Sequence, residues 1–102
     1  MDISSDDHER ILNWAERHLE IKKVWLYGSR ARGDNKFDSD IDLAIEMPIW
    51  SWFEWHSIYK EKPDLSLSAD AHLEWYQPNE GLVYVGKGVK NDGVLLYSTF
   101  WS

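Results

Sequence analysis

The sequence lacks cysteine and is poor in positive charge. Its 102 residues include 11 Lys and Arg against 18 Asp and Glu, which gives a formal net charge of −7. Without cysteine, disulfides and thiolate metal centres are excluded, and this fits a cytoplasmic protein. An acidic chain repels polyanions, so we expect no nucleic-acid binding through a basic face. The composition is compatible with acidic sites in which a metal ion neutralises the charge of the carboxylates.

Long apolar runs are also missing. No stretch approaches the roughly 18 residues of a membrane-spanning helix, and the N-terminus is polar rather than signal-like. Hydrophobic residues make up 43% of the chain and aromatic residues 15%, which suffices for one modest core. We therefore expect a single domain over residues 1–102 that does not enter a membrane.

Apolar periodicity predicts alternating helices and strands. Residues 6–20 repeat apolar side chains at helical spacing behind a serine cap. Period-two patterns or short apolar runs predict strands over residues 24–27, 40–46, 69–76 and 94–99. Residues 29–32 can form a short helix, whereas the glycines in residues 79–90 make a helix there doubtful. This order of elements indicates an α/β (α+β) domain.

The most informative stretch is GSRARGDNKFDSDID, residues 28–42. Gly28 lets the backbone approach a phosphate closely, and Ser29 adds a hydroxyl and an N–H at the start of a short helix. Arg30 and Arg32 supply planar donors that can neutralise phosphate oxygens. The first half of the stretch therefore predicts a phosphate-binding turn.

Two carboxylates close the same stretch. Because alternate residues of a strand share a face, Asp40 and Asp42 point to the same side of the sheet. Such a pair can hold two divalent ions, and oxygen ligands favour Mg²⁺ or Mn²⁺ over zinc. A Walker A loop is excluded because Asp34 and Asn35 stand where it needs Lys and Ser or Thr. An EF-hand is excluded because Leu43 stands where its turn needs glycine.

The stretch resembles the minimal nucleotidyltransferase domains of the DNA polymerase β superfamily, whose pattern is Gly-Ser, ten residues, then Asp-x-Asp. The resemblance implies a small mixed β-sheet flanked by helices. It also implies Mg²⁺-dependent transfer of a nucleoside monophosphate, with ATP as the expected donor. In this scheme Gly28 and Ser29 cradle the phosphates, while Asp40 and Asp42 bind metal and act in catalysis.

Members of the superfamily carry a third carboxylate on a neighbouring strand, which ligates a metal ion. Asp70 is our first choice, because it lies on the polar face of the strand expected over residues 69–76. Glu74, on the same face, and Asp64, just before the strand, are the alternatives. His72 lies between Asp70 and Glu74, where a carboxylate would be equally plausible.

Small domains of this kind resemble antitoxins encoded beside a helical HEPN toxin, to which they transfer AMP. We therefore expect a HEPN-like protein as the acceptor, since the chain is too short to include an acceptor-binding domain. Two alternatives stay open. One is a docking module without catalysis, which would use the aromatic segment of residues 49–62, including Trp50, Trp52, Trp55 and Tyr59. The other is a transferase for a small molecule such as an aminoglycoside.

Overall fold

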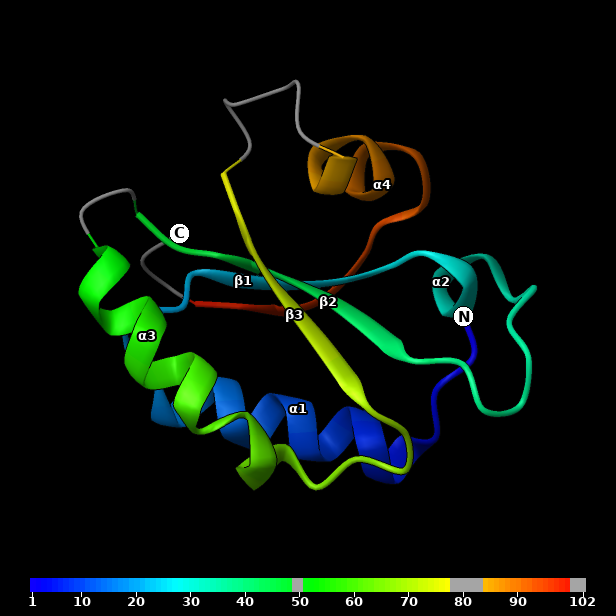
Figure 1. Ribbon diagram of the computed structural model, residues 1–102, viewed down its shortest axis with the longest axis horizontal. Coiled ribbons are helices and arrows are strands. Elements are labelled where there is room, and N and C mark those ends of the chain that lie inside the picture. Colours follow the sequence, from blue (N-terminus) through cyan, green and yellow to red (C-terminus); the bar gives the residue numbers. More distant parts are fainter. Residues whose placement is uncertain (49–50, 78–83, 100–102) are drawn as a thin grey trace.

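The computed structural model describes residues 1–48, 51–77 and 84–99, and a four-stranded sheet forms its centre (Figure 1). The strands are β1 (Lys23–Tyr27), β2 (Ile41–Glu46), β3 (Ala71–Tyr76) and β4 (Val94–Ser98). Their order is β3-β2-β1-β4. β1 runs antiparallel to β2 and β4, whereas β2 and β3 are parallel. This mixed sheet with its helices confirms the predicted α+β fold.

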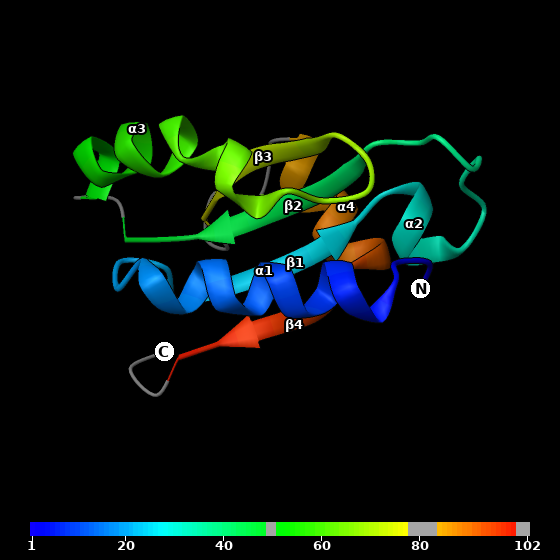
Figure 2. The same cartoon turned by 90° about the horizontal axis from the view of Figure 1, so that it is seen from below.

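Helices cover the two faces of the sheet unequally. They are α1 (Ser5–Arg17), α2 (Ser29–Arg32), α3 (Trp52–Lys60), the short 3-10 helix η2 (Lys62–Leu65) and α4 (Tyr84–Asp92). α1 and α3 lie on one face and enclose the main core, while α4 lies on the other (Figures 1 and 2). The smaller core under α4 consists of Tyr27, Ala44, Tyr76 and Val89. Within the described ranges, no helix combines the length and the apolar character needed to cross a membrane.

α1 forms where the periodicity predicts it but ends earlier. Ser4 caps the helix, because its hydroxyl oxygen accepts a hydrogen bond from the Asp7 N–H at 3.0 Å. The helix stops at Arg17 rather than at residue 20. His18 takes an extended conformation, and its carbonyl accepts a hydrogen bond from the Ile21 N–H at 3.0 Å. This turn leads the chain into β1.

The aromatic segment forms α3 and divides between core and surface. Ile58 is buried, and Trp55 stacks on Trp75 of β3 with ring centroids 6.2 Å apart. Phe53 and Tyr59 are 70% and 48% exposed. Ile49, Trp50 and the side chain of Trp52 lie outside the described residues. The described rings thus anchor α3 to β3 on one side and face outward on the other.

α4 contradicts the expectation drawn from its glycines. The helix spans Tyr84–Asp92 although it contains Gly86 and Gly88, so the doubt about a helix in this region was wrong. A Cβ at Gly88 would lie 3.0 Å from Tyr27 Cδ2, which is tighter than ordinary contact. Glycine therefore lets the helix approach the sheet closely. That packing offsets a propensity cost of about 1 kcal/mol for each helical glycine.

A buried carboxylate joins α1 to the segment before β3. Asp7 is 3% exposed. One of its oxygens accepts a hydrogen bond from the Ser68 N–H at 3.0 Å, and the other accepts one from the Ser68 hydroxyl. These two bonds fix the point from which β3 enters the sheet.

We predict that Asp7→Ala lowers the free energy of unfolding by about 1.5–3 kcal/mol, because the Ser68 donors lose a charged acceptor. Asp6→Ala is the control, since Asp6 is exposed one residue earlier in the same helix. It should cost at most about 1 kcal/mol through the helix dipole. Urea denaturation followed by tryptophan fluorescence measures both losses, and equal losses would contradict the role assigned to Asp7.

Candidate active site

The pairing of β1 with β2 brings the glycine turn against a carboxylate. Tyr27 and Asp42 are register partners, so Gly28, directly after β1, lies beside the Asp42 side chain. A Cβ at Gly28 would stand 2.6 Å from Asp42 Oδ2. Gly28 also has a φ of +75°, which side chains rarely tolerate. Glycine is therefore required here, and the two ends of the predicted motif meet.

Gly28 and Asp42 line a hollow of about 600 Å³, a volume typical of small-molecule sites. Its other polar side chains include Ser29, Arg32, His72, Glu74 and Asp92. Asp42 is on the α4 side of the sheet, because its neighbours Ile41 and Leu43 point into the core under α1 and α3. The structure thus gathers three of the four predicted phosphate-binding residues with the predicted metal ligand Asp42 and the alternative ligand Glu74.

The carboxyl group of Asp42 has a raised pKa. Burial is the largest cause, and the negative charge of Asp40 raises the pKa further. The nearby charge of His72 and its hydrogen bond to Asp42 act in the opposite direction. Burial and like charge both disfavour the ionised carboxylate, and a divalent cation would relieve both.

Asp40 and Asp70 line a second hollow, of about 400 Å³. The Ile41 N–H donates to the Asp70 carbonyl at 2.8 Å, which sets the two acids side by side where β2 and β3 begin. Glu74, by contrast, lines the hollow of Asp42. Asp64 is exposed on η2 and lines neither hollow. The three candidates for the third carboxylate are therefore in three different places.

His72 is the side chain that β3 places next to Asp42. The two residues are partners in the parallel register of β2 and β3. His72 Nδ1 lies 3.4 Å from Asp42 Oδ1, and His72 Nε2 lies 2.8 Å from Glu74 Oε1. The alternating pattern of residues 69–76 put His72 on the correct face. The strand register places His72, and not Asp70, next to Asp42. A single sequence does not reveal this register.

Asp40 and Asp42 line different hollows, although the charge of Asp40 is near enough to raise the pKa of Asp42. Among residues 1–48, 51–77 and 84–99, no three His, Asp or Glu side chains are arranged to hold a metal ion by themselves. Mg²⁺ needs no such cage, because it commonly binds one or two carboxylates together with water and substrate phosphates. Asp40 and Asp42 carry oxygen donors of that kind, and burial together with the charge of Asp40 raises the pKa of Asp42.

The guanidinium of Arg30 is turned toward the loop rather than toward the larger hollow. Arg30 is buried, at 7% exposure. It donates to the Ser39 carbonyl from Nε at 3.0 Å and from Nη2 at 2.6 Å. It also reaches the carbonyls of Asp2 at 3.1 Å and Phe37 at 3.4 Å. These bonds hold the loop between α2 and β2, and thereby position Asp40, which follows Ser39.

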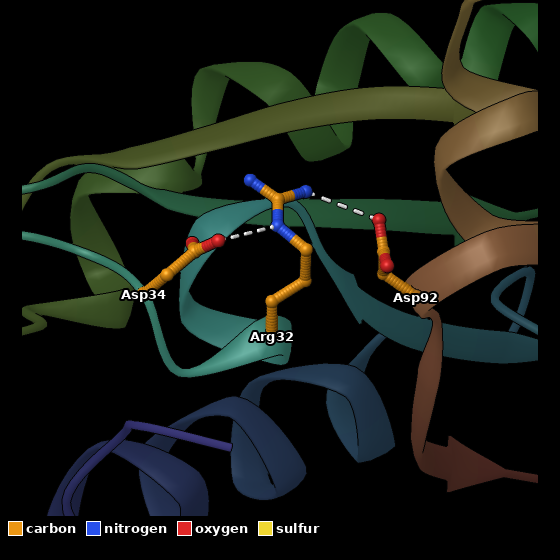
Figure 3. A network of polar contacts seen from close by, with 3 residues as sticks. All are labelled: Arg32, Asp34 and Asp92. Atoms are coloured by element: carbon orange, nitrogen blue, oxygen red, sulfur yellow. Dashed lines mark hydrogen bonds and ion pairs between the residues drawn. The ribbon is translucent and has the colours of Figure 1, made fainter.

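Arg32 lines the larger hollow and is held between two carboxylates (Figure 3). Its Nε lies 2.9 Å from Asp34 Oδ2, and its Nη1 lies 3.1 Å from Asp92 Oδ2. The hydrogen bond to Asp34, followed by that to Asp92, raises the pKa of Arg32. Because Asp92 ends α4, this contact links α4 to α2. Among the described side chains that line the hollow, Arg32 is the only Arg or Lys.

Comparison with known proteins agrees with this architecture. A family model described as "Polymerase beta, Nucleotidyltransferase" matches residues 9–99. The crystal structure of a toxin–antitoxin with AMP-PNP aligns with a TM-score of 0.59 at 18% identity, covering 92% of this chain and 75% of that one. A mutant of the toxin–antitoxin MntA–HpeT with two aspartate-to-glutamate changes gives 0.57 at 17% identity, with the same coverage. No curated protein matches the sequence.

We predict that Arg30→Gln lowers the free energy of unfolding by about 2–4 kcal/mol, because it leaves several loop carbonyls without a donor. Arg30→Lys should recover only part of the loss, since an ammonium cannot reproduce the planar fork. Arg17→Gln is the matched control, because Arg17 is exposed at the end of α1. Chemical denaturation measures the three variants. A loss for Arg30→Gln no larger than the control's would show that the loop does not depend on Arg30.

We also predict that Asp42→Asn stabilises the metal-free protein at pH 7. The raised pKa means that ionised Asp42 is less favourable in the folded protein than in the unfolded chain. The gain should be present above the raised pKa and shrink as the pH falls through it. Thermal melts in EDTA across this pH range provide the measurement, with Glu9→Gln on exposed α1 as the control. A lower melting temperature for Asp42→Asn at pH 7 would refute the prediction.

Proposed function

The chain belongs to the polymerase β family of nucleotidyltransferases, and we propose that it transfers AMP from ATP to a hydroxyl group of a protein acceptor, with Mg²⁺ or Mn²⁺. The observation that carries this proposal is the hollow in which the glycine turn meets Asp42. A triphosphate needs close backbone approach, hydrogen-bond donors and neutralising charge. Gly28 allows the close backbone approach, and Ser29 and Arg32 provide the hydrogen-bond donors. The Asp42 carboxylate can bind a divalent ion, which supplies the neutralising charge.

The proposed reaction is an in-line displacement at the α-phosphorus of ATP. The acceptor oxygen forms a bond to that phosphorus, and the bond to the pyrophosphate oxygen breaks, which releases pyrophosphate. Ser29 and Arg32 hold the phosphates, and Asp34 and Asp92 keep the Arg32 fork in its orientation. Asp40 and Asp42 would hold the divalent ions, which neutralise phosphate charge and activate the acceptor oxygen.

The reaction also needs a general base that accepts the proton of the acceptor hydroxyl. We assign this role to Asp70, because Asp70 and Asp40 line the same second hollow, and a backbone hydrogen bond joins Asp70 to Ile41, the residue after Asp40. The acceptor side chain would then enter through the second hollow while the triphosphate occupies the first. Glu74 is the alternative base, since it lines the nucleotide hollow itself.

A helical protein of the HEPN class is the proposed acceptor. The two structural neighbours are toxin–antitoxin assemblies, one of them with the ATP analogue AMP-PNP, and they support a toxin as the partner. The HEPN class itself rests on the resemblance of the sequence to antitoxins encoded beside such toxins. A docking role without catalysis is the second candidate. The exposed Phe53 and Tyr59 favour it, because their helix α3 covers the face of the sheet opposite the nucleotide hollow.

The direct test incubates the chain with α-labelled ATP, Mg²⁺ and the protein encoded by the neighbouring gene. We predict that label appears on the partner. Asp40→Asn and Asp42→Asn should each reduce the rate on the order of 100-fold or more, because the divalent ions contribute several kcal/mol of transition-state stabilisation. Glu9→Gln on the outer surface of α1 removes the same charge and should leave the rate unchanged.

The same assay separates the two candidate functions. No transfer by the wild-type chain with any of the four common nucleoside triphosphates would overturn the enzymatic proposal. Binding and neutralisation of the partner that survive Asp40→Asn combined with Asp42→Asn, but fail after Phe53→Ser, would support docking instead.

A further inference from the structure

Three polar side chains form a short chain across β2 and β3 at the floor of the nucleotide hollow. Asp42 and His72 are register partners, so their side chains leave neighbouring strands on the same face. His72 Nδ1 lies 3.4 Å from Asp42 Oδ1, and His72 Nε2 lies 2.8 Å from Glu74 Oε1. Asp42 is the most enclosed of the three, with 27% of its side chain exposed. The imidazole therefore has a carboxylate at each nitrogen.

Glu74 holds one edge of the His72 ring. An ionised carboxylate only accepts hydrogen bonds, so His72 Nε2 is the donor in the 2.8 Å contact with Glu74. On the other edge of the ring, His72 Nδ1 lies 3.4 Å from Asp42 Oδ1. A divalent ion bound to both of these atoms would take the place of the proton between them, because an imidazole nitrogen must be deprotonated to bind a metal ion. A carboxylate that holds the second nitrogen is also the usual support of a metal-binding histidine.

We propose that His72 Nδ1, together with Asp42, binds one divalent ion at this site, with Glu74 as the positioning residue. The ion takes two donors from these neighbouring strands and completes its coordination with water or phosphate oxygens. This agrees with the absence of a three-residue metal cluster from the part of the chain that the structure describes. Asp70 does not serve this ion, because it lies with Asp40 in the second hollow.

The ligand type determines which metal ion the site prefers. Carboxylate and phosphate oxygens suit Mg²⁺ and Mn²⁺ alike, whereas an imidazole nitrogen favours transition metals. A mixed set of one nitrogen and several oxygens therefore selects Mn²⁺ over Mg²⁺. The biological role of this ion rests on the proposed function, but its binding is measurable without any nucleotide transfer.

The test measures binding of Mn²⁺ alone to the full chain, by titration and by pulsed electron paramagnetic resonance. Wild-type protein should show the ¹⁴N modulation of a bound imidazole, and His72→Gln should lose it. The Kd for Mn²⁺ should rise roughly tenfold in His72→Gln, and a comparable rise is expected in Glu74→Gln. His72→Asp should keep metal binding but reduce the preference for Mn²⁺ over Mg²⁺. His56→Gln, on the exposed surface of α3, is the histidine control and should behave as wild type.

Two results would overturn this inference. One is the absence of Mn²⁺ binding or of ¹⁴N modulation in the wild-type chain. The other is an unchanged Kd in His72→Gln, which would leave His72 as an ion-pair partner of Asp42 only. Because His72 is half exposed, all variants should fold, and thermal melts verify this. A ¹⁴N signal without AMP transfer would uphold the metal site and refute the proposed function, so the two failures are distinguishable.

Discussion

The register between β1 and β2 is the constraint on which the rest of the site depends. It pairs Tyr27 with Asp42, so the chain must turn away from the sheet directly beside the carboxylate. Only a residue without Cβ fits there, because Gly28 has a positive φ and a Cβ at this position would stand 2.6 Å from Asp42 Oδ2. A slip by one residue would turn Asp42 into the apolar core under α1 and α3. The predicted phosphate turn and the predicted metal ligand are therefore one structural unit rather than two adjacent motifs.

The helices cover the two faces of the sheet unequally, and this leaves space for the hollow beside Gly28 and Asp42. On one face, α1 and α3 bury a continuous apolar layer, and that layer holds the strands in place. On the other face, the described residues form a smaller cluster around Tyr27 and Val89 under α4, next to the hollow. Gly88 lets α4 lie close to Tyr27, and the Arg32–Asp92 contact ties the end of α4 to α2. Among the described residues, α4 is therefore held by the close approach of Gly88 to Tyr27, by the buried side chain of Val89 and by the Arg32–Asp92 ion pair.

The sequence predicted those features that depend on local patterns. Apolar periodicity located α1 and all four strands, and the spacing of the Gly-Ser and Asp-x-Asp motifs located the residues that meet at Gly28 and Asp42. The helicity of α4 was missed because its glycines serve a tertiary contact with Tyr27, which local propensity does not include. Asp64, Asp70 and Glu74 lie in three different places because of the strand register and the course of the loops. A single sequence reveals neither the register nor the course of a loop.

The two arginines show the same limit at the level of side chains. Sequence reasoning treats Arg30 and Arg32 alike, since both follow the glycine turn and both suit phosphate. Folding separates them, because alternate positions of the one-turn helix α2 point in different directions. Arg30 is buried against the carbonyls of Ser39 and Phe37, while Arg32 reaches the hollow. Because it is buried, Arg30 stabilises the loop that precedes Asp40, whereas the sequence had suggested that it binds phosphate.

The charges around the hollow indicate which form of nucleotide it can accept. Its described lining includes Asp42, Glu74 and Asp92, and the guanidinium of Arg32 is already neutralised by Asp34 and Asp92. A free triphosphate would meet net repulsion there, since like charges at this range in a partly desolvated site interact strongly. A divalent ion would reduce that repulsion, because it would neutralise negative charge both on Asp42 and on the phosphates. Under the proposed function, the hollow would therefore receive the nucleotide together with its divalent ion, and the affinities for metal and nucleotide would be coupled.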